Sequence, residues 1–399
     1  MNYDAIIVGG GIVGLATAHR LLEARPQVKV LLVEKEAKLA AHQTGNNSGV
    51  LHSGLYYRPG SEKARLSVGG LKQMVAFCRV HGIAHEICGK IVVATEESEL
   101  PRLENLLERG NANGMEGLRK LNPSQIREIE PHAAGLAAIH VPQEGIVDYP
   151  GVCEKLGELI RKAGGEIKLN TRAEKIVPDG AGWVIETPAG NFRTNFVVTC
   201  GGLHADRLVR AAGNKTIAKI VPFRGEYFKI KPARQYLVRN LIYPVPDPKF
   251  PFLGVHFTRL VLGGVEAGPN AVLAFAREGY KWTNVNLRDL SESLLYPGLW
   301  KFMIKYPSMC GYEIHRSLSK AEFTRSLQKL VPEVREEDLE PGGAGVRAQA
   351  MLPEGKLIED FHFEEAQGIL HVINAPSPAA TASLAIGAKI VEKVLTRLK

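Results

Sequence analysis

A glycine-rich turn close to the start of the chain most constrains how this sequence can fold. An apolar run over residues 3–8 predicts a short buried strand, and Gly9, Gly11 and Gly14 follow it in the spacing GxGxxG. A helical apolar pattern comes next, and then a second strand that ends at Glu34, twenty residues beyond the last glycine. This order predicts a strand–helix–strand unit at the N-terminus.

Each residue of this motif has a physical role in holding a dinucleotide. Gly9 permits the tight turn, Gly11 lets a pyrophosphate approach the backbone, and Gly14 lets helix and strand pack closely. Glu34 can accept both ribose hydroxyls, which disfavours a 2′-phosphate. We therefore predict dinucleotide binding. The alternative is a glycine-rich turn beside a surface glutamate, and the motif alone does not choose between NAD and FAD.

The composition of the 399 residues fits a folded globular protein of two or three domains. Hydrophobic residues make up 45% and charged residues 23%, which excludes a disordered, collagen-like or disulfide-scaffold chain. The net charge is +8, but no run of five like charges occurs, so we do not expect a nucleic-acid partner. A modest basic excess suits anionic substrates or an anionic membrane surface.

Cysteine usage and apolar stretches bear on the compartment. The five cysteines are scattered and never spaced as CxxC, which suits a reducing compartment, and no cluster has metal-ligand spacing, so we expect no metal. No export signal is visible at the N-terminus. Residues 368–388 lack charge, but Pro376 and Pro378 make a membrane span implausible. The expected location is the cytoplasm, with peripheral contact to the inner membrane surface left open.

A polar, glycine-rich segment over residues 42–57 is too long for a simple turn and can run beside a bound cofactor. With it, the chain resembles the FAD-dependent D-amino-acid-oxidase-like superfamily, and within it the L-2-hydroxyglutarate oxidases and dehydrogenases. The strings that carry the resemblance keep their order over nearly the whole chain: HQTGNNSGVLHSGLYY (42–57), PFRGEYF (222–228), YPVPDP (243–248), PFLGVHFT (251–258), GPNAVLAF (268–275), AGVRAQA (344–350) and NAPSPAAT (374–381).

The resemblance implies an α/β flavoprotein with two interleaved domains. An FAD domain would comprise residues 1–85, 145–215 and 342–399, and a substrate domain with an antiparallel sheet over the flavin would comprise residues 86–144 and 216–341. The expected cofactor-binding residues are Gly9, Gly11, Gly14, Glu34, Lys35, Thr44, Asn47, Ser48, Ala173, Gly201, Asp206, Arg347, Ser377 and Ala379.

The end of the chain supports this expectation on physical grounds. Ser377 can cap the last helix, with Pro378 at its first position. The start of that helix, if aimed at the flavin, would stabilise the negative charge of the reduced ring. An ordinary capped terminal helix is the alternative.

The reaction implied is loss of a hydride from C2 of a 2-hydroxy acid to flavin N5 and of a proton from its hydroxyl. Histidine is the natural base near neutral pH. His52 and His256 are the main candidates, with His256 slightly preferred and His42 a weaker third, although any of them can be structural. Arg347 is the expected carboxylate-binding or flavin-edge cation, and Tyr243 could donate to a substrate carboxylate.

Other polar candidates are weaker. Arg224 and Arg259 are expected to be structural or to contact the residues that bind the substrate. Tyr227 could donate a hydrogen bond to a substrate carboxylate, but buried tyrosine hydroxyls commonly bond the backbone instead. Residues 294–306 mix large apolar side chains with Lys301 and Lys305. This segment could lie on a membrane where a quinone takes the electrons, but a helix packed on the substrate domain is the interpretation that we favour.

The electron acceptor, quinone or oxygen, stays open at this stage. Three rival functions also remain: an amine or amino-acid oxidase of the same superfamily, a flavin-binding subunit without catalysis, and an NAD-dependent dehydrogenase.

Overall fold

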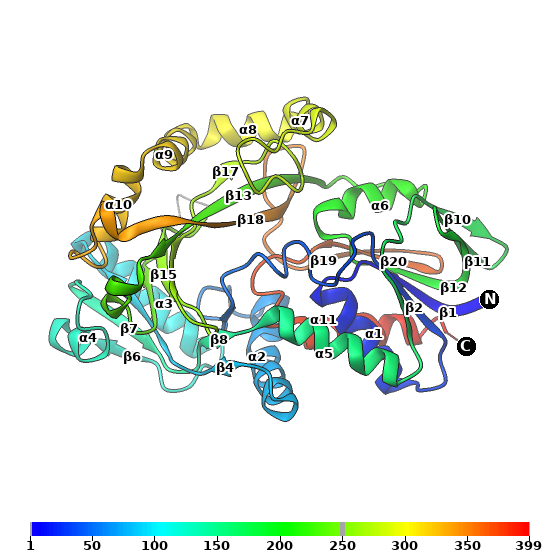
Figure 1. Cartoon of the computed structure of the whole chain (residues 1–399), viewed down its shortest axis with the longest axis horizontal. Coiled ribbons are helices and arrows are strands. Elements are labelled where there is room, and N and C mark those ends of the chain that lie inside the picture. The colour runs from blue at the N-terminus through cyan, green and yellow to red at the C-terminus, as the bar shows by residue number, and fades with distance from the viewer. Residues whose placement is uncertain (1, 248–251, 399) are drawn as a thin grey trace.

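The computed structural model describes residues 2–247 and 252–398, which form two domains side by side (Figure 1). Both ends of the chain lie at the outer edge of one domain, on the right in Figure 1. The predicted α/β class, with a Rossmann-like domain and a second domain built on a largely antiparallel sheet, is confirmed.

The first domain contains an eight-stranded sheet whose central order is β10-β11-β12-β1-β2-β9. Its strands are β1 (Asn2–Val8), β2 (Val30–Val33), β9 (Glu166–Lys168), β10 (Lys175–Asp179), β11 (Gly182–Thr187), β12 (Gly190–Thr199), β19 (His362–Ala366) and β20 (Ile369–Asn374). The long strand β12 pairs with β11 along its first half and with β20 along its second half. Strand β2 is buried along its whole length, as parallel strands covered on both faces must be.

Helices cover both faces of this sheet. They are α1 (Ile12–Ala24), α2 (Glu62–His81), α5 (Tyr149–Lys162), α6 (Ala205–Ala211) and α11 (Ser383–Leu395). In Figure 1, α1, α5 and α11 lie below the sheet and α6 above it. A Cβ on Gly387 would lie 2.8 Å from the backbone of Ala16, so this glycine permits α11 to cross α1 closely. A three-stranded sheet of β3 (Val50–Leu51), β8 (Gly145–Val147) and β4 (His85–Glu86) lies beside them.

The second domain contains a nine-stranded sheet. Its strands are β5 (Lys90–Ala94), β6 (Arg119–Leu121), β7 (Ala137–Val141), β13 (Lys219–Ile230), β14 (Leu241–Pro244), β15 (His256–Arg259), β16 (Val265–Gly268), β17 (Val272–Leu273) and β18 (Leu339–Met351). All pairs are antiparallel except β14 with β5. Strand pairing between β13 and β18 runs the full length of β18.

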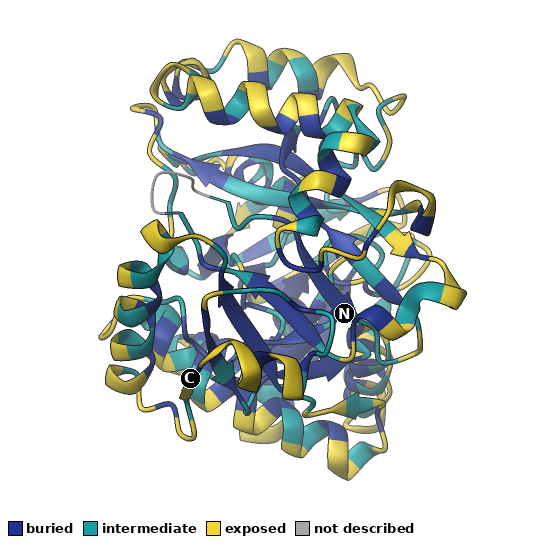
Figure 2. Ribbon diagram, turned by 90° about the vertical axis from the view of Figure 1, so that its left-hand side faces the viewer, coloured by how far each residue is buried: buried dark blue, intermediate teal, exposed yellow. Residues whose placement is uncertain are grey.

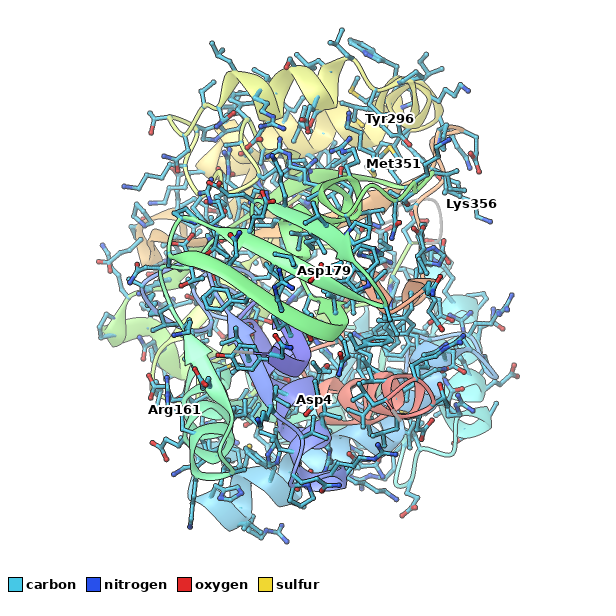
Figure 3. All side chains as sticks on the ribbon, turned by 90° about the vertical axis from the view of Figure 1, so that its right-hand side faces the viewer. Asp4, Arg161, Asp179, Tyr296, Met351 and Lys356 are labelled. Atoms are coloured by element: carbon cyan, nitrogen blue, oxygen red, sulfur yellow. The ribbon has the colours of Figure 1, made fainter. Side chains whose placement is uncertain are left out.

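Six α-helices among the described residues complete this domain. They are α3 (Leu100–Ala112), α4 (Pro123–Ile129), α7 (Leu287–Leu294), α8 (Pro297–Lys305), α9 (Pro307–Leu318) and α10 (Lys320–Gln328). The last four form an outer layer above the sheet, with buried inner faces and exposed outer ones (Figure 2). Tyr296, just before α8, donates a hydrogen bond to the carbonyl of Met351 at 2.8 Å and ties this layer to the end of β18 (Figure 3). Among the described residues, no helix is long and apolar enough to cross a membrane.

The domain boundary predicted at residue 342 lies inside β18, whose ladder to β13 continues to Met351, and we propose a boundary after that residue. One detail of the sequence analysis needs correction. Ser377 does not cap the last helix, because α11 begins at Ser383 and residues 377–382 form turns before it. The residue at the N-cap position of α11 is Ala382, and no side chain caps this helix.

Candidate functional site

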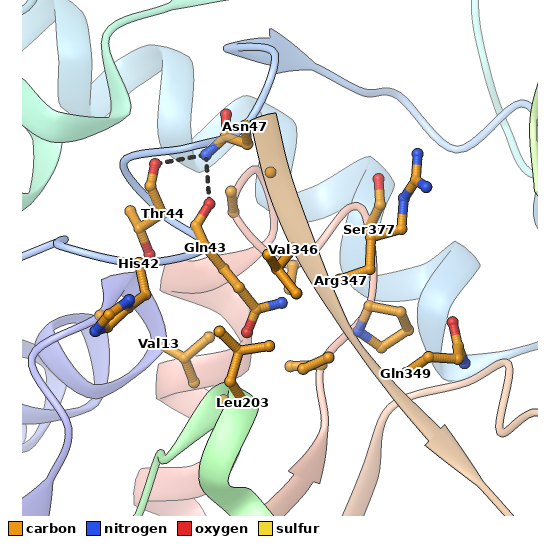
Figure 4. A pocket seen from close by; sticks show the side chains of 18 of the residues that line it. Val13, His42, Gln43, Thr44, Asn47, Leu203, Val346, Arg347, Gln349 and Ser377 are labelled. Atoms are coloured by element: carbon orange, nitrogen blue, oxygen red, sulfur yellow. Dashed lines mark hydrogen bonds between the residues drawn. The ribbon is translucent and has the colours of Figure 1, made fainter. Parts of the chain in front are cut away.

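One large cavity of about 1670 Å³ runs between the two domains. It exceeds the roughly 300–1,000 Å³ of ordinary small-molecule pockets, so it has room for an extended cofactor and a small substrate. Its wall begins at the glycine-rich turn after β1 and reaches the inner side of the β13–β18 sheet. Figure 4 shows Gln43, Thr44 and Asn47 on one wall and Arg347 and Gln349 on β18 across from them.

The three glycines of the motif differ in the space around them. A Cβ on Gly9 would lie 2.4 Å from the carbonyl oxygen of Cys200, and one on Gly14 would lie 2.0 Å from that of Gly9. Both glycines are therefore required by the protein's own backbone. A Cβ on Gly11 would meet only the hydroxyl of Thr44, at 3.5 Å, and Gly11 lines the cavity. The protein itself does not need a glycine here, so the open space beside Gly11 fits the close approach of a pyrophosphate.

Neighbouring residues fix the shape of this end of the cavity. The Glu34 carboxylate accepts the amides of Gly10 (2.6 Å) and Glu36 (2.9 Å) at the tip of β2. The Thr44 hydroxyl accepts the amide of Ile12 in the first turn of α1 (3.2 Å). Asn47 closes the same loop by donating to the carbonyl of Thr44 at 2.6 Å (Figure 4). The polar segment after β2 therefore lies along the cavity.

Nearly all the predicted site residues line this one cavity. Those that do are Gly9, Gly11, Gly14, Glu34, Lys35, His42, Thr44, Asn47, Ser48, His52, Ala173, Gly201, Tyr227, Tyr243, His256, Arg347, Ser377 and Ala379. Arg224 and Arg259 lie outside it. Arg224 is fully buried beneath the Trp282 ring and paired with Glu226, and Arg259 is paired with Glu86.

Asp206 does not line the cavity, and its expected role in cofactor binding is corrected. Its carboxylate is 1% exposed and forms a two-pronged ion pair with the buried guanidinium of Arg277. Arg277 also donates to the carbonyl of Leu203 at 2.7 Å. The pair therefore fastens the segment after β17 to the start of α6, which is a structural task.

A polar cluster ties the same segment to the end of β2. Glu36, His42 and Glu278 have side-chain atoms within 4.8 Å of one another. The Lys35 ammonium pairs with both carboxylates, at 2.6 Å from Glu278, and lies 3.1 Å from His42. The hydrogen bond from His204 and the contact with Lys35 lower the pKa of Glu278 despite its burial. A lysine thus occupies the place that a metal cation would take.

Three aromatic rings gather at the other end of the cavity. Tyr243 on β14 stacks on His256 of β15, with ring centroids 3.8 Å apart, and its edge faces His52 at 6.5 Å. The backbone amide of His52 donates to the Thr381 hydroxyl at 3.2 Å, which fixes the residue just after β3. Both histidines predicted from the sequence therefore meet at one place.

The two histidines have different surroundings. His256 is 6% exposed, and its Nδ1 donates to the carbonyl of Gly254 at 2.9 Å. Burial lowers the pKa of His256 to about 3, so the ring is neutral and a weak base. His52 has its Nδ1 3.6 Å from the fully buried carboxylate of Glu144.

Arg347 lies on β18, directly opposite Phe223 of β13. Its guanidinium donates to the carbonyl of Asn270 at 3.2 Å and lies 5.5 Å from the centroid of Phe252. Burial lowers the pKa of Arg347, but the guanidinium stays charged. One hydrogen bond to a neutral carbonyl leaves most of its donors for an anionic ligand.

Two residues of this site, Lys90 and Glu144, were missed by the sequence analysis. Both side chains are fully buried and form an ion pair behind His52. The available signal was weak. Lys90 precedes the apolar strand IVVA as a charge out of pattern, and Glu144 lies in the turn between two short strands.

The fold and cavity define a two-domain flavoprotein oxidoreductase. Residues 4–393 match the family model described as FAD dependent oxidoreductase, and the chain belongs to this family. The cofactor of the family is FAD, which the open space at Gly11 and the extended cavity fit.

Full-length relatives and a solved structure agree with this assignment. The chain is 51% identical to "L-2-hydroxyglutarate dehydrogenase" of Indibacter alkaliphilus, covering 100% of both chains. It is 46% identical to "L-2-hydroxyglutarate dehydrogenase, mitochondrial" of Nematostella vectensis, covering 99% of this chain and 91% of the relative. A reduced L-alpha-glycerophosphate oxidase of Mycoplasma pneumoniae with FAD bound has the same fold, with a TM-score of 0.81, 22% identity, and coverage of 100% and 95%.

Proposed function

We propose that this chain oxidises L-2-hydroxyglutarate to 2-oxoglutarate with FAD as its cofactor. One observation carries the proposal. The cavity that begins at the dinucleotide turn ends where two histidines and a half-buried arginine meet, in a chain that matches L-2-hydroxyglutarate dehydrogenases over its full length. Bound FAD supplies the acceptor for the hydride that leaves C2 of the substrate.

The residues that would hold FAD follow from the cavity wall. The amides at the start of α1, beside Gly11, would bind the pyrophosphate, and Glu34 would accept the ribose hydroxyls. The backbone at Ala173 would hold the adenine, and the turn around Ser377 and Ala379 would contact the flavin end. These roles rest on position along the cavity and on the motif.

We assign the base to His52 rather than to His256, the residue that the sequence analysis slightly preferred. The pKa of about 3 makes His256 a poor proton acceptor. His52 lines the cavity with 15% of its side chain exposed and would take the proton of the substrate hydroxyl. Arg347 would bind a substrate carboxylate with its unused donors, with Tyr243 beside it.

An anaerobic visible spectrum of the purified holoprotein tests the substrate. We expect L-2-hydroxyglutarate to bleach the oxidised flavin band. A yellow protein that stays yellow with this acid but is bleached by an amine would move the function to the amine oxidases. A flavin band that no donor bleaches would favour a non-catalytic flavin subunit, and a protein purified without flavin would contradict the proposal.

For the electron acceptor, we propose a quinone reached at an anionic membrane surface. The outer face of α7 and α8 exposes large apolar side chains: Leu287 (80%), Leu295 (81%), Trp300 (50%) and Ile304 (75%). Exposed Lys301 and Lys305 lie among them. The inner face of α8 packs Leu299 and Phe302 on the sheet, so the packed helix favoured from the sequence and an exposed apolar face occur together.

Sedimentation with vesicles tests this contact. We expect the holoprotein to sediment with vesicles that contain anionic lipid and the double variant Leu295→Ser/Ile304→Ser to stay in the supernatant. Leu136→Ser, at an exposed leucine (46%) that belongs to neither α7 nor α8, serves as the control. Equal sedimentation of all three proteins would refute the assignment of this face, and flavin reoxidation by oxygen but not by a soluble quinone would refute the acceptor.

A further inference from the structure

The feature that the proposed mechanism leaves unused is a buried ion pair behind His52. The Glu144 carboxylate and the Lys90 ammonium are both 0% exposed and in direct contact. A buried ion pair is seldom worth its desolvation cost, and apolar residues of similar volume often give equal or higher stability. Its position one contact away from a cavity histidine therefore points to the chemistry of the site.

The geometry fixes the Glu144 carboxylate from three sides. One oxygen, Oε1, accepts the amide of Ser53 at 3.0 Å and its hydroxyl at 2.8 Å. The other, Oε2, contacts Lys90 and lies 3.6 Å from Nδ1 of His52. A Cβ on the next residue, Gly145, would lie 2.1 Å from the carbonyl of Glu86, so the turn that carries Glu144 has no room to shift.

The Nδ1 atom of the His52 ring faces Glu144. It is buried, makes no hydrogen bond within the described residues, and lies 3.6 Å from the Glu144 carboxylate. The side chain retains 15% exposure and lines the cavity, which leaves Nε2 on the cavity side. A carboxylate facing Nδ1 selects the tautomer with the proton on Nδ1, so Nε2 presents its lone pair to the cavity.

We propose that Glu144 is a positioning residue that holds His52 in the Nδ1–H tautomer, and that Lys90 keeps Glu144 in place as its buried counter-ion. The inference rests on the proposed function only in its last step, where Nε2 of His52 takes the proton from the substrate hydroxyl. Neither Glu144 nor Lys90 lines the cavity, so each acts through His52.

The charges of the pair support this arrangement. Burial would raise the pKa of Glu144, but the adjacent Lys90 and His52 lower it well below its ordinary value, so Glu144 stays ionised. Tyr56, Tyr57, Tyr149 and Tyr243 interact electrostatically with Glu144, and His256 interacts with His52, Arg347 and Lys90. Of the carboxylates, Glu144 alone is at ion-pair distance from His52 among the described residues.

The test uses Glu144→Gln and the double variant Lys90→Met/Glu144→Gln in the FAD-loaded protein. The glutamine keeps an oxygen for Ser53 but removes the charge, and the double variant also removes the stranded lysine, which guards against loss of folding. Glu130→Gln is the matched control, because Glu130 is also 0% exposed but accepts the backbone amides of Arg239 and Asn240 instead of facing a cavity histidine.

The first readout needs no substrate. Long-range ¹H–¹⁵N spectra of ¹⁵N-histidine-labelled protein near pH 8 report the tautomer of His52, assigned by its loss in His52→Asn. We expect the Nδ1–H form in the parent protein and in Glu130→Gln, and a mixture or the Nε2–H form in both Glu144 variants. Unchanged tautomers in folded Glu144 variants would overturn the proposal.

The second readout is the pH profile of flavin reduction by L-2-hydroxyglutarate in anaerobic stopped flow. We expect both Glu144 variants to lose about ten- to a hundredfold of the rate, a part of the roughly 10²–10⁴ that a general base supplies, with the acid limb of the profile displaced. A parent protein that this acid does not reduce would count against the proposed function alone, since the tautomer result stands separately. Parent-like profiles in both variants would remove the positioning role.

Discussion

Substitution of Gly11 by alanine tests whether FAD binding or the folding of the protein requires a glycine at this position. Gly11 has φ −78° and ψ 173°, which alanine adopts without strain. The added methyl group meets only the Thr44 hydroxyl, at 3.5 Å. Less unfolded-chain entropy stabilises the variant by about 0.4–1 kcal/mol, and a less favourable N-cap costs a comparable amount. We expect the melting temperature of the apoprotein to stay within about 2 °C of the parent.

The methyl group does, however, fill the space through which a pyrophosphate must approach the start of α1. Loss of one charge-assisted hydrogen bond costs about 1.5–3 kcal/mol, and each 1.4 kcal/mol is tenfold in affinity. We therefore expect FAD to bind Gly11→Ala about ten- to a hundredfold more weakly than the parent apoprotein. Titration of apoprotein with FAD, followed by the quenching of flavin fluorescence, measures the difference.

Gly14→Ala provides the contrasting control in the same turn. Its methyl group would lie 2.0 Å from the carbonyl oxygen of Gly9, so helix and strand must separate. Here we expect the apoprotein itself to melt at lower temperature, by the 1–3 kcal/mol typical of overpacking or more. If Gly11→Ala binds FAD as tightly as the parent, or destabilises the apoprotein as Gly14→Ala does, then the open space beside Gly11 is not the pyrophosphate site.

Three further predictions concern charge. Burial raises the pKa of Glu130 from 4.5 to about 7, so the contribution of Glu130 to stability is complete below pH 4.5 and falls by about 3 kcal/mol as the pH rises to 7. Because glutamine does not titrate, the melting temperature of Glu130→Gln relative to the parent should rise between pH 4.5 and 7. A difference in melting temperature that stays constant over this range would contradict the prediction. Arg277→Met leaves the buried Asp206 carboxylate with its longer contact to Arg210 (3.4 Å), so we expect a loss of about 3–5 kcal/mol that Arg277→Met/Asp206→Asn partly restores. Thermal unfolding that shows no recovery would disprove the pairing argument. Arg347→Met should lower the second-order rate of flavin reduction by L-2-hydroxyglutarate about ten- to a hundredfold while FAD affinity changes little, and a parent-like rate would remove Arg347 from the substrate site.

The cofactor half of the site could be predicted from the sequence because its chemistry is local. Gly9, Gly11 and Gly14 lie within six residues of one another, and their roles follow from one turn and one helix start. Glu34 follows at the end of the next strand, which the alternation of strand and helix places beside them. Short-range rules therefore decide this part of the cavity wall.

Asp206 shows where the same logic failed. Asp206 follows a strand-to-helix turn, as a cofactor contact would. Its carboxylate instead pairs with Arg277, which lies 71 residues further along the chain. The spacing of residues 199–206 does not indicate that a buried arginine of the second domain contacts Asp206. Ser377 is a similar case, because the turns that delay α11 to Ser383 depend on contacts such as Thr381 with the β3 segment.

The substrate half is assembled from contacts that span most of the chain. The His52 amide donates to Thr381, 329 residues away, and Ser53 donates to Glu144, 91 residues away. Glu144 could still have been placed from strand pairing alone. Lys90 opens β5 and lies opposite Val141 of β7, three residues before Glu144. A lysine at the start of a fully apolar, buried strand needs a carboxylate partner close to it. Glu144, in the turn after the neighbouring strand β7, is such a carboxylate. A charge that breaks the pattern of a buried strand, taken together with the register of its partner, thus indicates which charged residues lie behind a candidate site histidine.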